Sequence, residues 1–153
     1  MRLALFQPDI PQNTGTLMRL AACLDIGIDI IEPCGFVFSE KNLKRAGMDY
    51  LQLVNCKRHD SWQDFLNFRE QNKREYGRII LLSTHATERY CDFEFLPNDI
   101  ILMGRESAGV PQEVHDFADE RLIIPMNEKA RSINVAISAA MAVGEALRQT
   151  RWR

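Results

Sequence analysis

The chain has 153 residues, of which 46% are hydrophobic and 26% charged, and its formal net charge is −2. This length fits one domain, expected to span residues 1–153, and the apolar share excludes intrinsic disorder and collagen-like repeats. The sequence offers neither the ~18 uncharged apolar residues of a transmembrane helix nor an apolar run long enough for a secretory signal. We therefore expect a cytoplasmic protein that does not associate with a membrane.

Apolar runs alternate along the chain with segments of helical periodicity. Strands are expected over about 3–6, 28–31, 51–54, 78–83, 99–104 and 121–125. Helices are expected over about 14–24, 39–46, 62–72, 111–117 and 133–148, the third of them capped by Ser61. This alternation, in which several strands are fully apolar, predicts an α/β fold with a mostly parallel sheet flanked by helices on both faces.

The last predicted helix is apolar around most of its circumference. Ile133, Ile137, Met141 and Leu147 form one apolar row, and a second row rich in alanine lies beside it. Such a helix should be buried on more than one side. Because a single domain of this size rarely has room for a central helix at its C-terminus, we favour a homodimer interface over a central core helix.

Cysteines and histidines do not suggest a metal site. The four cysteines, at positions 23, 34, 56 and 91, form no Cys-x-x-Cys pair, and the three histidines are dispersed. Neither set has the spacing of zinc ligands. We predict no metal and expect reduced cysteines that serve as packing residues.

The first motif is Asn13-Thr14-Gly15, followed four residues later by Arg19. Asn13 precedes the helical pattern and can cap that helix, whereas Arg19 falls off its buried face and should reach back toward the helix N-terminus. A guanidinium at that place suits an anion or a ribose–phosphate. The alternative is a capping asparagine with an exposed arginine nearby.

Two more motifs follow predicted strands. Gly104 to Pro111 has glycines spaced like those of a P-loop, but Val110 stands where the lysine must be, which excludes that motif. What remains is a ligand-binding or purely structural glycine loop with Glu106 at its centre. Ser132 and Asn134 open the last helix, where capping alone could explain them. Since ligands gather at the carboxyl ends of parallel strands, the joint placement of all three motifs predicts one site.

Basic residues cluster despite the low net charge. Residues 41–58 hold five of them against the single acid Asp49, namely Lys41, Lys44, Arg45, Lys57 and Arg58. They form either a solvated surface or a surface that contacts phosphates.

Together these residues resemble the SpoU–TrmD (SPOUT) class of S-adenosylmethionine-dependent RNA methyltransferases. The segments 13–19, 104–111 and 124–135 are similar to the three motifs of that class, in order. Residues 31–36 and 45–50 resemble a small single-domain subgroup that methylates the ribose of the tRNA wobble nucleotide. That resemblance implies a C-terminal trefoil knot, S-adenosylmethionine as methyl donor, and a homodimer that reads the anticodon stem-loop of tRNA through the five basic residues above.

The resemblance also implies roles for individual residues. The cofactor pocket would be lined by Leu82, Gly104, Ile124, Met126 and Ser132. The catalytic set would be Asn13, Arg19, Ser132 and Asn134, with Arg19 reaching across the dimer. Because a guanidinium is a poor base, we expect Arg19 to orient the ribose–phosphate and stabilise the developing oxyanion. Glu106 either faces the sulfonium or, with Gly109, organises its loop.

This sequence departs from the class pattern at two positions. Ala108 stands where many relatives carry an arginine, and Arg105 supplies a cation three residues earlier. Gly144 replaces an aromatic residue of some relatives. Two alternatives stay open, namely the same chemistry on another tRNA position or on rRNA, and a non-catalytic cofactor-binding dimer that binds RNA.

Overall fold

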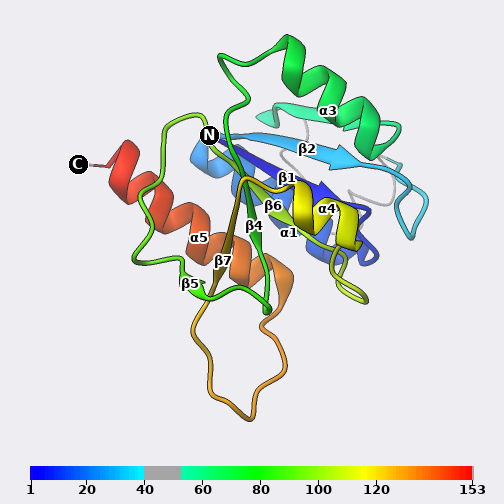
Figure 1. Cartoon of the computed structure of the whole chain (residues 1–153). Helices are drawn as coiled ribbons and strands as arrows, with labels where there is room; N and C mark the ends of the chain where they lie inside the picture. Colours follow the sequence, from blue (N-terminus) through cyan, green and yellow to red (C-terminus); the bar gives the residue numbers. More distant parts are fainter. Residues whose placement is uncertain (40–52, 153) are drawn as a thin grey trace.

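The structure, a computed structural model, describes residues 1–39 and 53–152 (Figure 1). Within these ranges the helices are α1 (Pro11–Leu24), α3 (Trp62–Gln71), α4 (Gln112–Phe117) and α5 (Val135–Thr150). The strands are β1 (Arg2–Phe6), β2 (Gly27–Ile31), β3 (Cys56–His59), β4 (Ile79–Leu82), β5 (Glu88–Arg89), β6 (Ile100–Met103) and β7 (Glu120–Ile123).

All these strands join one sheet in the order β3-β2-β1-β6-β4-β7-β5, and each recorded pairing is parallel. The chain builds outward from β1 through β2 to β3, and later strands fill the other side. The order therefore reverses between β1 and β6, the kind of place where open α/β sheets bind ligands. The predicted α/β fold with a parallel sheet is confirmed.

Two apolar cores cover the two faces of the sheet. Helices α1 and α5 lie on one side of the sheet, and α3 and α4 on the other (Figure 1). Alternate residues of a strand point to opposite faces, so Leu3 and Leu5 pack with α1 and α5, whereas Ala4 and Phe6 pack with α3 and α4. Strands β4 and β6 contribute to both cores because they are apolar at every position. This double coverage fixes the central strands whose carboxyl ends carry the site.

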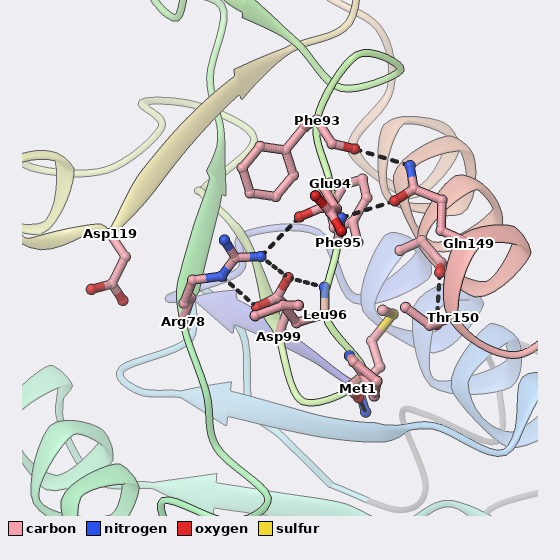
Figure 2. Close-up of polar contacts among 12 residues, drawn as sticks. Met1, Arg78, Phe93, Glu94, Phe95, Leu96, Asp99, Asp119, Gln149 and Thr150 are labelled. Atoms are coloured by element: carbon pink, nitrogen blue, oxygen red, sulfur yellow. Dashed lines mark hydrogen bonds and ion pairs between the residues drawn. The ribbon is translucent and has the colours of Figure 1, made fainter.

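Helix α5 is attached to the segment that leads into β6 (Figure 2). The Gln149 amide donates to Phe93 O at 2.9 Å and accepts from Phe95 N at 2.9 Å. Nearby, Arg78 donates to both carboxylate oxygens of Asp99, at 3.0 and 2.8 Å. The Gln149 contacts hold the C-terminal helix against the amino edge of the sheet, and the Arg78–Asp99 pair joins the segments that precede β4 and β6. The trefoil knot that the resemblance implies stays a prediction.

A buried carboxylate joins three strands on the other half of the sheet. Asp29 of β2 accepts from Arg2 Nε at 2.6 Å through Oδ2 and from the Tyr76 hydroxyl at 2.9 Å through Oδ1. His59 Nε2 also lies 2.7 Å from Oδ1. All four side chains are buried. Burial also raises the pKa of Tyr76, which keeps its hydroxyl a donor.

The structure differs from the sequence prediction at several elements. The predicted strand over 51–54 is wrong where it is described, since Leu53 and Val54 lie outside any strand and pairing begins at Cys56. Strand β3 lies at the sheet edge, so Lys57 and Arg58 break its apolar pattern. Strand β5 was not predicted. The helix expected over 39–46 falls outside the described residues, apart from Ser39, which is not helical.

Candidate functional site

A cavity of about 750 Å³ opens at the carboxyl edge of the sheet. Its lining comes from the ends of β4, β6 and β7, from the segments that follow these strands, from Ile10 and Asn13 at the start of α1, and from the first turn of α5. The volume lies within the ~300–1,000 Å³ typical of small-molecule and cofactor sites. The three separated motifs therefore meet at one hollow, as their joint placement predicted.

The segment after β6 is a tight hairpin. Arg105 and Gly109 exchange both backbone hydrogen bonds, each at 2.9 Å. Gly109 has φ +64°, a conformation that favours glycine. A Cβ on Gly104 would lie 2.7 Å from the backbone carbon of Gly109, so this position also needs glycine. The two glycines thus fix the path of the backbone at the cavity wall.

Glu106 ties this hairpin to the segment after β1. One carboxylate oxygen accepts from Asp9 N at 2.8 Å, and the other accepts from the Asn13 amide at 3.2 Å. In return, Asp9 accepts from Ser107 N at 3.1 Å and from the Ser107 hydroxyl. The Ser107 hydroxyl lowers the pKa of Asp9, which stays ionised near neutral pH. Both carboxylates are therefore engaged in holding the loops together.

Asn13 does not cap α1, contrary to the sequence prediction. The helix begins at Pro11, so Asn13 lies within its first turn, and the residue at the cap position, Ile10, offers no side-chain acceptor. The Asn13 side chain instead accepts from the Asn134 amide at 3.1 Å while it donates to Glu106. Asn134 does cap α5, since its oxygen accepts from Ala136 N at 2.9 Å. One chain of hydrogen bonds thus links all three motifs.

The residues expected to hold a cofactor all line the cavity, namely Leu82, Gly104, Ile124, Met126 and Ser132. Other lining residues were not predicted, among them Thr84, Gln112, His115 and Arg131. Nothing in the sequence singled these out, because each is an isolated polar residue in a short helix or loop. Only their position beyond adjacent strand ends brings them to the site.

The remaining predicted residues lie elsewhere. Arg19 is exposed on α1 and is absent from the cavity lining of its own chain. Lys57 lies with its ammonium 3.5 Å from the Phe68 ring centroid, and Arg58 donates to the Glu32 carboxylate at 2.7 Å. Neighbouring strand residues point to opposite faces, so these two cations do not share one surface. Lys41, Lys44 and Arg45 fall outside the described residues.

Other chemistry finds little support in the part of the chain that the structure describes. Residues 1–39 and 53–152 contain no group of three or more His, Cys, Asp or Glu placed to hold a metal ion. The four cysteines are free, and burial raises the pKa of Cys34 and of Cys56 to about 11, which keeps both as thiols. None of the described helices is both long and apolar enough to cross a membrane.

Comparison with known proteins identifies the family of the chain. The SpoU rRNA methylase family matches residues 1–144. The chain belongs to this family. Within it, a tRNA (cytidine(34)-2'-O)-methyltransferase of Beijerinckia indica is 55% identical over 147 residues, which cover 96% of this chain and 90% of that protein. The Yersinia pestis enzyme of the same name is 34% identical over 151 residues and covers 97% of this chain and 93% of its own.

Solved structures of SpoU enzymes agree with the fold. A structure concerned with the 2-OH methylation of C/U34 on tRNA has TM-score 0.88 and 38% identity, and covers 97% of this chain and 94% of that chain. The SpoU methyltransferase AviRb of Streptomyces viridochromogenes, solved in complex with AdoMet, has TM-score 0.86 and 25% identity, with 97% of this chain matched to 57% of that chain. The resemblance to the SPOUT class is therefore confirmed.

Proposed function

We propose that this protein transfers a methyl group from S-adenosylmethionine to the ribose 2'-OH of nucleotide 34, a cytidine or uridine, in tRNA. The observation that carries the proposal is the convergence of three separated motifs on one cavity, in a chain that shares most of its length with enzymes named for this reaction. In this proposal one domain spans residues 1–153 and acts in the cytoplasm, where tRNA is its substrate.

The cavity fits the methyl donor. Leu82 and Ile124 supply apolar walls that suit an adenine ring, and the fixed backbone at Gly104 lets a ligand approach closely. Both ring nitrogens of His115, which lines the cavity, are buried without a hydrogen-bond partner in the described residues. A polar ligand in the cavity would satisfy them. When bound, S-adenosylmethionine supplies an electrophilic methyl group on a sulfonium.

The main contribution of the protein to the reaction rate is to position the two reactants. Methyl transfer is an in-line displacement, and holding two reactants in the right geometry provides much of the rate. The hydrogen bonds from Glu106 to Asn13 and from Asn13 to Asn134 hold the three loops in register around the cavity. In this proposal Arg19 binds the ribose–phosphate and stabilises the charge that develops on the 2'-oxygen as its proton leaves to phosphate or water.

A homodimer brings Arg19 to the reaction. Since Arg19 is exposed and lies outside the cavity lining of its own chain, we infer that it serves the cavity of a second subunit. Two large apolar side chains of α5 support this assembly, because Ile137 and Met141 are 57% and 37% exposed. A helix that is apolar on its outer side as well as its inner side needs a second partner.

Arg58 is the described member of the five basic residues between positions 41 and 58 that we expect to contact RNA, whereas Lys57 points to the opposite face of β3. Unpaired loop bases are the part of RNA most open to reading, so we expect the dimer to bind the anticodon stem-loop. Arg58 supports this role because it lies near the carboxyl end of β3, at the edge of the sheet on which the cavity opens.

The experiment that tests the function is mass mapping of ribose methylation in tRNA from cells that lack the gene. We expect nucleotide 34 to lose its 2'-O-methyl group in one or more tRNAs and to regain it when the purified enzyme and S-adenosylmethionine are added. If nucleotide 34 is unchanged and a 2'-O-methyl group is lost from another tRNA or rRNA position, that position is the substrate instead. Binding of the methyl donor without any methylation would identify a non-catalytic protein.

A further inference from the structure

Arg105 and His115 stand apart among the described residues. Three buried side-chain nitrogens there have no hydrogen-bond partner, and all belong to these two residues: Nε of Arg105 and both ring nitrogens of His115. Both residues line the cavity. Buried polar groups in folded proteins nearly always have partners, so such a coincidence marks places where a ligand supplies the missing atoms.

Three other partly or fully buried arginines among the described residues are paired with carboxylates. Arg2, Arg69 and Arg78 each donate to an aspartate, at 2.6, 2.8 and 2.8 Å. Arg105 instead lies against an aromatic ring, with its guanidinium carbon 5.6 Å from the Phe6 ring centroid. A buried Nε–H without an acceptor is unfavourable, because it loses water without gaining a hydrogen bond. A ligand in the cavity that Arg105 lines could supply the missing acceptor.

The backbone around Arg105 is held in one conformation by hydrogen bonds within the chain. The two hydrogen bonds with Gly109 fix the base of the hairpin, and Glu106 and Ser107 fasten its next two residues to the segment after β1. The nearby carboxylates of Glu106 and Asp9 are already occupied by these loop contacts. The backbone origin of Arg105 is therefore fixed. The charge of Arg105 also helps to lower the pKa of Asp9, but that carboxylate is held by Ser107, which leaves the planar fork of Arg105 to meet an incoming anion at little entropic cost.

We propose that Arg105 binds a phosphate oxygen of the RNA strand at the target nucleotide. The proposal rests on the proposed function, which puts an RNA ribose beside the methyl donor. The Arg105 guanidinium lies toward β1, against the Phe6 ring, whereas Leu82 ends β4 and Ile124 follows β7, the second and third strands from β1 in the sheet. At ~4.8 Å per strand, the Phe6 side of the cavity is roughly 10–14 Å from the wall that Leu82 and Ile124 form. The carboxylate of the donor has the same chemistry as a phosphate oxygen, and separate affinities for tRNA and for the donor distinguish the two.

The test compares Arg105→Gln, Arg105→Lys and wild type, with Arg74→Gln as the control. Arg74 is exposed after α3, at the opposite edge of the sheet, so its replacement removes the same charge away from the cavity. Binding of an unmodified tRNA transcript is measured by filter retention at several salt concentrations, and binding of S-adenosylmethionine by calorimetry. Thermal unfolding and methylation of nucleotide 34 are followed in the same preparations.

We expect Arg105→Gln to weaken tRNA binding roughly 10- to 100-fold, the range for a charge-assisted hydrogen bond, and to reduce the slope of log affinity against log salt by about 0.7–1. Arg105→Lys recovers part of the binding as a point charge. Affinity for S-adenosylmethionine stays at the wild-type value. The Tm falls by no more than about 2–4 °C, because the contact with the Phe6 ring that is lost is a weak one. Arg74→Gln keeps wild-type tRNA affinity.

Three results would overturn the phosphate contact in an enzyme whose wild type methylates nucleotide 34. Unchanged tRNA binding in Arg105→Gln would show that Arg105 binds no phosphate. A loss of affinity for S-adenosylmethionine alone would assign it to the carboxylate of the donor, and a lowered Tm with a parallel loss of both ligands would make it structural. A wild-type enzyme that leaves nucleotide 34 unmodified overturns the proposed function instead.

Discussion

Replacing Glu106 by Gln separates the two roles that its position allows. The substitution keeps the shape but removes the charge, and the amide oxygen can accept only one of two bonds, from Asp9 N at 2.8 Å or from the Asn13 amide at 3.2 Å. The amide NH2 then faces the other donor. Losing one charge-assisted bond at this partly exposed position costs about 1.5 kcal/mol, which lowers the Tm by about 3–6 °C in a chain of this length.

The assay is calorimetric titration of wild type and Glu106→Gln with two ligands that differ in charge. S-adenosylmethionine carries a sulfonium, whereas S-adenosylhomocysteine carries a neutral thioether. If Glu106 organises the loops, both affinities fall by the same factor together with the Tm. The exposed Glu75→Gln serves as the control and changes none of them. A selective loss of S-adenosylmethionine at unchanged Tm would show that the carboxylate acts on the sulfonium and would refute the loop role.

Three further changes test the proposed assembly, catalysis and pH response. Arg19→Lys should lower kcat/KM for tRNA by roughly 10-fold or more, since a point charge replaces a planar fork; near-wild-type kinetics would rule out the orienting role. The double variant Ile137→Glu, Met141→Glu should sediment as a folded monomer, because both side chains are exposed in the single chain, and a variant that remains dimeric would place the interface elsewhere. The hydrogen bond from Arg148 lowers the pKa of Glu145 from 4.5 to about 2, so its stabilising effect is full above pH 4.5 and is lost as the pH falls toward 2. Glu145→Gln should therefore be slightly less stable than wild type at pH 7 and equal to it near pH 2 in chemical denaturation, since exposed ion pairs contribute little; a difference that persists at pH 2 would contradict this assignment.

The central strands could be predicted because burial on both faces leaves an unbroken apolar run. Strands β4 and β6 each consist of four apolar residues, and the structure buries nearly all of them. The edge of the sheet gave no such signal. Strand β3 carries Lys57 and Arg58, and the two residues of β5 are both exposed. An edge strand needs only one neighbour, so tertiary pairing decides its position rather than local pattern.

The place of the site could be predicted, but its internal contacts could not. Motifs that follow parallel strands must gather at one edge, which brought Asn13, Glu106 and Asn134 together in the prediction. Their hydrogen bonds join residues 93 and 121 positions apart, and these depend on strand order and on where α1 begins. Pro11 starts that helix three residues earlier than the capping pattern predicted, so that Asn13 links two loops instead of capping the helix.

The distribution of hydrogen bonds separates the scaffold from the site. Away from the cavity, the charges of Arg2, Arg69 and Arg78 are satisfied within the chain, and each fastens one element to another. At the cavity, Nε of Arg105 and both ring nitrogens of His115 have no hydrogen-bond partner in the described residues, although internal bonds fix the backbone that carries them and the Asp116 carboxylate lies 3.5 Å from His115 Nδ1. Such unpaired groups lower the free energy of unfolding of a marginally stable protein, and a bound ligand that supplies the missing hydrogen bonds restores it. Substrate and cofactor should therefore raise the stability of this edge of the sheet far more than that of the opposite edge, which is already satisfied.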